Sequence, residues 1–159
     1  MEPLDPTDAA ILQVLATDGR IPNNALAAKV GLAPSTCLVR VRGLQQRGVI
    51  RGFAADVDPA ALGFPIQAMV AITMQSHARG RLAEYMDEVL LMPGVLNAYL
   101  LAGGSDFLVH VAAASVEELR TLVIDRVSQD PDVASTETSL IFRYARATRV
   151  PVTTVAAAH

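Results

Sequence analysis

The chain has 159 residues, of which 52% are hydrophobic and 18% are charged, and its formal net charge is -3. This composition excludes extended disorder and is typical of a folded globular protein, and the length allows one ordinary domain or two small ones. A single cysteine excludes an internal disulfide framework and is typical of a reducing compartment.

The N-terminal residues and the distribution of charge bear on location and partners. MEPLDPTD lacks the basic and apolar regions of a secretory signal, and the longest nearly apolar stretch, GFPIQAMVAITM, is too short to cross a bilayer. We therefore expect a cytoplasmic protein with no membrane partner. Residues 19–55 contain six basic residues and no acidic residue, although the whole chain is acidic. This asymmetry indicates that one part of the chain meets a polyanion.

The first fifty residues are predicted to form three short helices. Asp5 is the expected N-cap of the first helix, which begins at a proline. The second is expected over residues 24–30 and the third over residues 34–47, with Gly48 as the stop. Three helices joined by glycine-bearing turns are typical of a helix-turn-helix domain, which we assign to residues 1–52.

The third helix is predicted to have one apolar and one polar face. Cys37, Val41 and Leu44 fall at i, i+4 and i+7, so they form one apolar stripe. The hydroxyl, amide and guanidinium groups elsewhere on this helix suit the base edges and phosphates of a DNA major groove, which the N-terminal end of such a helix enters. The residues that we expect to contact DNA are Ser35, Thr36, Val39, Arg40, Arg42, Gln46 and Arg47.

Two simpler interpretations stay open for this helix. The arginines can serve solubility alone, as charge runs usually do, although the three-helix context and the absence of acidic residues favour DNA. Cys37 can be a redox sensor or a core residue, and its place on the apolar stripe favours the core.

The remaining elements follow in a second, β-rich part. VIRGFAADVDPAALG has strand-like content before a turn, so we expect a strand and linker over residues 53–65. The expected elements beyond it are IQAMVAITM, GRLAEYMDEVLLM, VLNAYLLA, DFLVHVAAA, SVEELRTLVIDRVSQ and VASTETSLIFRY. The order β-α-β-β-α-β predicts an α+β protein whose second domain, residues 66–146, is ferredoxin-like. The tail, residues 147–159, shows no periodicity.

The loop LAGGSDFLV between the two central strands has two possible uses. Gly103 and Gly104 can adopt positive φ, so that successive backbone N–H groups form an anion-binding nest, and Asp106 adds a carboxylate. These groups are the minimum needed to bind a free amino acid. The simpler interpretation is an ordinary β-hairpin turn without a ligand, and the residues alone favour it.

Little else in the chain indicates chemistry. His77, His110 and His159 are scattered, and with one cysteine they provide no metal-ligand spacing. There is no P-loop, no Rossmann fingerprint and no nucleophile elbow. We expect no catalytic residue, no metal and no cofactor.

Three ordered motifs place the N-terminal part in a known family. They are LD..D..IL..L...GR, LA..VGL and R(V)..L...GVI.G. This part resembles the leucine-responsive regulatory protein family, also called Lrp/AsnC or feast/famine regulators, and the resemblance continues to about residue 146. It implies a winged-type helix-turn-helix domain followed by an effector-binding and dimerisation domain called RAM. One departure is Ala33, where members often carry a capping Ser.

The resemblance also implies a site and an assembly. The loop from Gly103 to Asp106, which includes Ser105, matches the family's G-x-x-D loop, which in relatives helps to bind an amino acid at a dimer interface. Thr136 and Thr138 of the last strand are implied to line the same pocket. The implied partners are double-stranded DNA, a small effector and further copies of the chain, as a dimer or a higher even oligomer such as an octamer.

Two functions from different classes follow. The first is a sequence-specific DNA-binding transcription regulator of the Lrp/AsnC type, which responds to a small effector, an amino acid, and is not an enzyme. The alternative is a ferredoxin-like metabolite-binding module or enzyme whose N-terminal helices mediate protein contacts. The basic segment favours the regulator, and no catalytic group supports the alternative.

Overall fold

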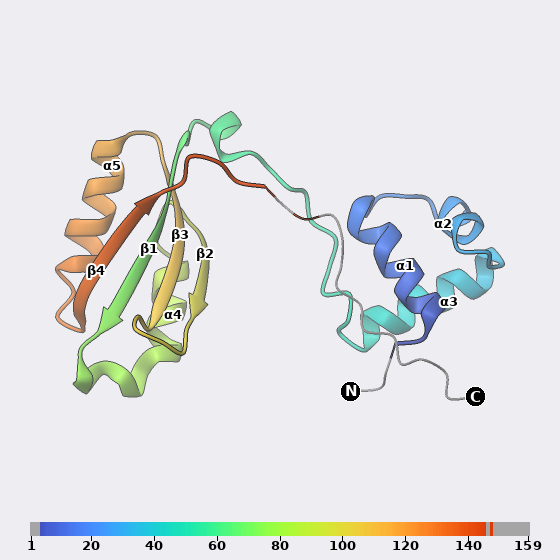
Figure 1. Cartoon of the computed structure of the whole chain (residues 1–159), viewed down its shortest axis with the longest axis horizontal. Coiled ribbons are helices and arrows are strands. Elements are labelled where there is room, and N and C mark those ends of the chain that lie inside the picture. Colours follow the sequence, from blue (N-terminus) through green and yellow to red (C-terminus); the bar gives the residue numbers. More distant parts are fainter. Residues whose placement is uncertain (1–3, 146, 148–159) are drawn as a thin grey trace. The chain divides into compact units, whose positions relative to one another are not determined.

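The computed structural model describes residues 4–145 and residue 147. The chain divides into two compact units, and the division falls between Ala55 and Asp56 (Figure 1). Each unit has its own hydrophobic core. The predicted tail over residues 147–159 lies outside the described residues, except for residue 147.

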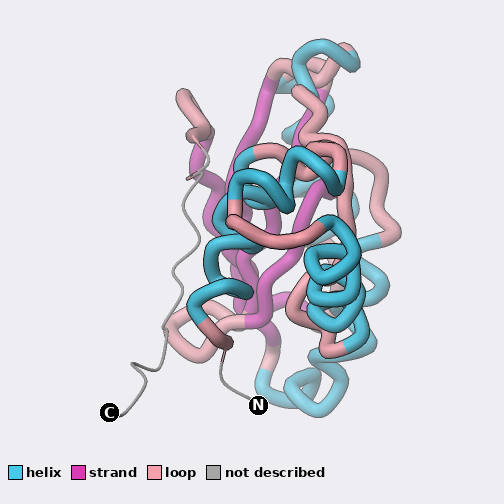
Figure 2. The backbone as a smooth tube through the Cα atoms, turned by 90° about the vertical axis from the view of Figure 1, so that its right-hand side faces the viewer, coloured by secondary structure: helices cyan, strands magenta, loops and turns pink. Residues whose placement is uncertain are grey.

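The first unit consists of helices α1 (Pro6–Thr17), α2 (Asn23–Lys29) and α3 (Pro34–Gln46). The predicted cap of α1 is confirmed, because the Asp5 carboxylate accepts a hydrogen bond of 2.7 Å from the backbone N–H of Asp8. The glycines that follow α2 and α3 both have a φ of 70°, the left-handed conformation that ends a helix and that glycine adopts without strain. Residues 4–55 contain helices and turns but no strand. All the strands of the described residues, magenta in Figure 2, belong to the second unit.

The core of this unit confirms the predicted apolar stripe of α3. Cys37 and Leu44 are at most 1% exposed, and they pack with Ile11 of α1 and Leu26 of α2. Burial of an aliphatic side chain of this size stabilises a fold by roughly 1.5–3 kcal/mol. Burial also raises the pKa of the Cys37 thiol, so this group is a core residue that resists ionisation.

The strand predicted within residues 53–65, and with it the wing, is not formed in this chain. The structure has instead a short 3-10 helix, η1 (Pro59–Leu62), whose cap is the Asp58 carboxylate accepting from the N–H of Ala60 at 3.0 Å. The residues before η1 are exposed. A strand needs the edge of another strand to pair with, and β-rich composition alone does not supply one.

The second unit contains one antiparallel sheet with the strand order β2-β3-β1-β4. Its strands are β1 (Ile66–Met74), β2 (Val95–Leu100), β3 (Phe107–Ala113) and β4 (Val133–Leu140). The predicted ferredoxin-like β-α-β-β-α-β order is confirmed. In β1 the helix-facing positions are fully buried and the alternate positions are half-buried, so one face of the sheet carries the core.

Each of the two predicted helices is composite. The first consists of the 3-10 segment η2 (Ser76–Arg81) followed by α4 (Leu82–Leu90). The second consists of α5 (Val116–Thr121), which continues as the π-helical segment η3 (Leu122–Ser128). Ser115 caps α5 by accepting a hydrogen bond of 3.1 Å from a backbone N–H of its first turn.

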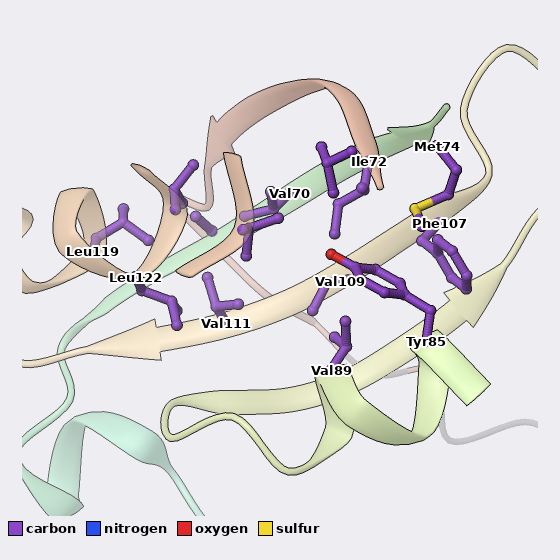
Figure 3. Packing of buried hydrophobic residues seen from close by; sticks show 14 of the residues in the cluster. Val70, Ile72, Met74, Tyr85, Val89, Phe107, Val109, Val111, Leu119 and Leu122 are labelled. Atoms are coloured by element: carbon purple, nitrogen blue, oxygen red, sulfur yellow. The ribbon is translucent and has the colours of Figure 1, made fainter. Parts of the chain in front are cut away.

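Both helical segments contribute to the same core, on one face of the sheet (Figure 3). Tyr85 of α4 packs on Phe107 of β3 with 5.5 Å between the ring centroids. Tyr85 is 1% exposed, and its hydroxyl has no hydrogen-bond partner among the described residues. Desolvation raises the pKa of this hydroxyl to about 12. The opposite face of the sheet is left without helices.

Candidate DNA-binding face and effector site

The exposed side of α3 is the candidate DNA-binding face. Its first turn presents Ser35 and Thr36 to solvent, and Val39 is 68% exposed. Arg42 and Gln46, further along the helix, are exposed as well. The structure therefore brings these five predicted residues to the surface of one helix, which contains no acidic residue.

The start of α3 lacks a side-chain cap, as the residue at that position predicts. Ala33 occupies the N-cap position and offers no acceptor to the first turn, while Pro34 begins the helix. The Asn23 amide at the start of α2 donates a hydrogen bond of 2.9 Å to the Pro34 carbonyl. This contact ties the beginning of α2 to the beginning of α3.

Arg40, in contrast, is engaged inside the unit. Its Nη1 lies 2.5 Å from Asp5 Oδ2 and 2.9 Å from Asp8 Oδ1, and both aspartates belong to the start of α1. Arg47 Nη1 lies 3.6 Å from Asp8 Oδ2. Two of the seven predicted DNA contacts thus link α3 to α1, which the sequence did not indicate.

These ion pairs shift the pKa values of Asp5 and Arg40. The backbone N–H of Asp8, followed by the Arg40 guanidinium, lowers the pKa of the Asp5 carboxyl. The hydrogen bonds to Asp5 and Asp8 raise the pKa of Arg40 in turn. Both groups are charged at neutral pH, and the two shifts favour the ion pair between α1 and α3.

The second candidate site is the hairpin loop between β2 and β3. The Leu101 N–H donates to the Asp106 carbonyl at 2.8 Å and closes the hairpin. Gly103 and Gly104 are exposed, and a Cβ on either would contact nothing within 4 Å. Ser105 is half-buried.

The anion-binding nest predicted at Gly103 and Gly104 is not formed. Neither glycine has positive φ, whereas a nest requires successive residues of alternating backbone hand. The hairpin closes without the left-handed conformation, so its N–H groups do not converge on an anion as expected.

Asp106 is held in place by the sheet. Its Oδ2 accepts a hydrogen bond of 2.7 Å from the N–H of Met74, at the end of β1, and its own N–H donates to the Ile72 carbonyl at 2.9 Å. Its Oδ1 lies 3.9 Å from Arg79 Nε. One carboxylate oxygen is therefore structural, and the other makes the longer contact with Arg79.

Thr136 and Thr138 lie on one face of β4, as predicted, but it is the helix-covered face. They pair with Ile72 and Val70, whose side chains are in the core, and paired residues of antiparallel strands project to the same side. The Thr136 hydroxyl shares a hydrogen bond of 2.8 Å with that of Ser128. In strand order β1 separates β4 from the strand that follows the hairpin loop.

Other kinds of site are not evident in the described part of the chain. No three His, Cys, Asp or Glu side chains within it are grouped to hold a metal ion. None of its helices combines the length and the apolar character needed to span a membrane.

Comparison with known proteins decides what the two units are. Residues 4–45 match the AsnC-type helix-turn-helix domain, and residues 67–151 match the Lrp/AsnC ligand binding domain. The chain belongs to the Lrp/AsnC family. Members of this family combine the helical unit with the α+β unit described above, so the predicted family and fold class are confirmed.

Individual relatives of this Lrp/AsnC protein are transcription regulators. The HTH-type transcriptional regulator AldR of Mycolicibacterium smegmatis is 52% identical over 143 residues, which are 90% of this chain and 84% of AldR. The leucine-responsive regulatory protein of Rhizobium meliloti is 34% identical over 140 residues, which are 88% of this chain and 90% of the relative.

Solved structures agree with this assignment. The crystal structure of MtbAldR has a TM-score of 0.73 and 42% identity, and the match covers 93% of this chain and 100% of that chain. A transcriptional regulator from Neisseria meningitidis, solved as a complex with L-Met, has a TM-score of 0.83 and 29% identity, with 93% and 96% covered. The chain is a DNA-binding transcription regulator of the Lrp/AsnC type and not an enzyme.

Proposed function

We propose that the exposed face of α3 reads operator DNA and that an amino acid bound to the second unit controls this binding. The observation that carries the DNA assignment is the surface of α3 itself. Its first turn is polar and exposed, and residues 19–55 contain no acidic residue that would repel phosphates. Ser35, Thr36 and Val39 contact base edges, because the N-terminal end of a recognition helix enters the major groove.

Arg42 and Gln46 bind the DNA backbone in this proposal. Both are exposed and lie beyond the first turn of α3, where side chains border the groove rather than enter it. Arg40 and Arg47 have another task. Because Asp8 contacts both guanidinium groups, we assign them to fixing α3 on α1, with Arg47 also adding positive charge near the phosphates.

A salt series tests the DNA assignment. Arg42→Ala should lower the slope of log affinity against log salt by about 1 for a mixed-sequence duplex, because one phosphate contact releases about one counterion. Arg120→Ala is the matched control, since Arg120 makes its ion pair with Glu117 on the surface of the second unit. Fluorescence anisotropy of a labelled duplex gives the slopes. Equal slopes for wild type and Arg42→Ala would remove Arg42 from the interface.

The effector in this proposal is a free amino acid bound at the β2–β3 loop. The loop is exposed at Gly103 and Gly104, and Asp106 offers one oxygen beside it. Relatives support the ligand class, because one was solved with L-Met and another is named leucine-responsive. Thr138 is exposed and Thr136 is half-buried, but both lie on the helix-covered face and not on the face proposed for contact between copies, so this proposal assigns them no effector contact.

Calorimetry with the twenty common L-amino acids tests the effector. At least one should bind the wild type and change its DNA affinity. Asp106→Asn keeps an oxygen that accepts from the N–H of Met74 but removes the negative charge. It should therefore weaken the binding of the amino acid without unfolding the unit. If none of the twenty binds, the loop is only a hairpin turn.

The helix-free face of the sheet is the proposed contact between copies of the chain. Met69 and Leu108 lie on this face, and Tyr99 of β2 pairs with Leu108 and is 50% exposed. The Gln67 and His110 side chains on the same face are 3.0 Å apart and satisfy each other. A second copy would cover these apolar groups, and dimers could assemble further into even oligomers such as an octamer.

A further inference from the structure

The segment η2 lies at the end of the sheet at which β1 ends and β3 and β4 begin (Figure 1). It carries a row of basic side chains, His77, Arg79 and Arg81. Two aspartates meet them there: Asp106, directly before β3, and Asp132, directly before β4. These three basic side chains do not have equal partners.

Arg81 forms ion pairs with three carboxylates of the second unit. Its guanidinium lies 2.5 Å from Asp132 Oδ2, 2.8 Å from Glu88 Oε1 and 3.3 Å from Glu84 Oε2. His77 Nε2 lies 3.3 Å from the other oxygen of Asp132. These contacts join η2 to α4 and to the start of β4, so this half of the row has a structural role.

Arg79 makes a much weaker contact. Its side chain is 60% exposed, and its Nε lies 3.9 Å from Asp106 Oδ1, beyond hydrogen-bond distance. An exposed ion pair of this kind contributes little to stability. A ligand that offers each partner a closer counter-charge can therefore replace the pair at little cost.

The pair lies beside the hairpin loop, where the proposed effector lacks a partner for its carboxylate. Because Gly103 and Gly104 do not form a nest, the loop backbone does not provide the anion site that the sequence predicts. Arg79 can provide it, since it already points toward Asp106, the last residue of the loop. A guanidinium binds a carboxylate through two parallel hydrogen bonds, which a single N–H cannot do.

We infer that Arg79 binds the α-carboxylate of the effector and that Asp106 Oδ1 accepts from its α-ammonium. The zwitterion thus bridges the two side chains and exchanges one loose ion pair for two hydrogen-bonded ones. Recognition is directed at the backbone of the amino acid, and its side chain is left to other residues. The inference rests on the proposed amino-acid function and names the residue that would select α-amino acids from amines and amides.

The experiment compares amino acids with their α-amides, which keep the ammonium and lack the carboxylate charge. Calorimetry uses wild type, Arg79→Met and the control Arg120→Met, first with L-methionine and L-methioninamide and then with the other nineteen amino acids. Wild type should prefer the acid to the amide by about tenfold to a hundredfold, the value of a charged hydrogen bond. Arg79→Met should lose that preference through weaker binding of the acid alone, and Arg120→Met should keep it.

A second variant distinguishes the loss of the guanidinium from a loss of folding. Arg79→Lys keeps the positive charge but lacks the two parallel donors of the guanidinium. Its affinity for the acid should therefore lie between those of wild type and Arg79→Met. Unchanged preference in Arg79→Met, or an equal loss of acid and amide, overturns the inference while the effector function stands. Failure of wild type to bind any of the twenty amino acids overturns both.

Discussion

Gly94 is a residue at which the fold of the second unit depends on the absence of a side chain. Its φ is 87°, and an added Cβ would lie 2.7 Å from the carbonyl oxygen of Ala112. Gly94→Ala should lower the free energy of unfolding by about 2–4 kcal/mol, because it combines backbone strain with a contact to a rigid backbone atom. Urea denaturation measures the change. Gly103→Ala is the matched control, and it should stay within about 0.5 kcal/mol of wild type.

The Tyr85 hydroxyl is buried without a hydrogen-bond partner in the part of the chain that the structure describes. Tyr85→Phe should leave the free energy of unfolding unchanged or raise it by up to about 1 kcal/mol, because the buried hydroxyl has no partner to lose. The ring itself is needed, so Tyr85→Ala should cost about 3–5 kcal/mol. Since folding raises the pKa of Tyr85 to about 12, wild type should lose stability as pH rises above the unfolded value of about 10. Thermal melts at neutral and alkaline pH should show this loss in wild type and less of it in Tyr85→Phe.

At the scale of elements, the α1–α3 link is the feature that most directly affects the DNA-binding face. Asp8→Asn should lower the free energy of unfolding of the first unit by about 1–3 kcal/mol, a range reduced from that of a fully buried pair because Arg40 is one-third exposed. Arg40→Met should cost a similar amount, and the double variant should cost less than the sum of the two. The helical circular dichroism signal, recorded across a urea series, measures the unfolding of the first unit.

Asp18→Asn is the control for this link, since Asp18 lies beyond the far end of α1 and its carboxylate accepts a hydrogen bond of 3.0 Å from the nearby Arg20 N–H. Acid should break the same link. The pKa of Asp5 is lowered in the folded state, so its contribution is complete above the ordinary value of about 3.9 and is lost as pH falls through the folded value. Additive costs for Asp8→Asn and Arg40→Met would mean that the two side chains act separately.

Much of the element order could be predicted because local signals decide it. The Asp5 cap, the glycine stops and the alternating pattern of β1 each depend on neighbouring residues. The prediction of a strand within residues 53–65 was wrong for the opposite reason. A strand forms only where another strand is present to pair with it, and local composition does not reveal that partner.

The candidate sites were less predictable because they depend on contacts between distant elements. The sequence predicts Arg40 as a DNA contact, but packing of α3 on α1 places its guanidinium against Asp5 and Asp8. The sequence does not indicate Arg79 as a site residue, because only the fold of the sheet end brings it to Asp106. The one histidine and two arginines of SHARGR were the available signal, but a surface segment of this kind usually marks only solubility.

At the scale of the whole molecule, the helix-free sheet face and the single short recognition helix argue for a symmetric assembly. One α3 would cover few base pairs, and in the proposed dimer two copies of it bind at once, which raises both affinity and specificity. A dimer formed through the sheets has twofold symmetry, which requires an inverted repeat in the DNA. The two half-sites then lie about one helical turn apart, on the same side of the duplex.

The spacing of the half-sites tests this arrangement without knowledge of the effector. Selection of bound duplexes from a random library should return an inverted repeat. Insertion of about five base pairs between its halves should weaken binding, because the second half rotates to the opposite side of the duplex, whereas about ten base pairs should restore part of the affinity. Gel shifts at fixed salt measure the series. A smooth decline with length, with no recovery at a full turn, would show that the two recognition helices do not act as a twofold pair.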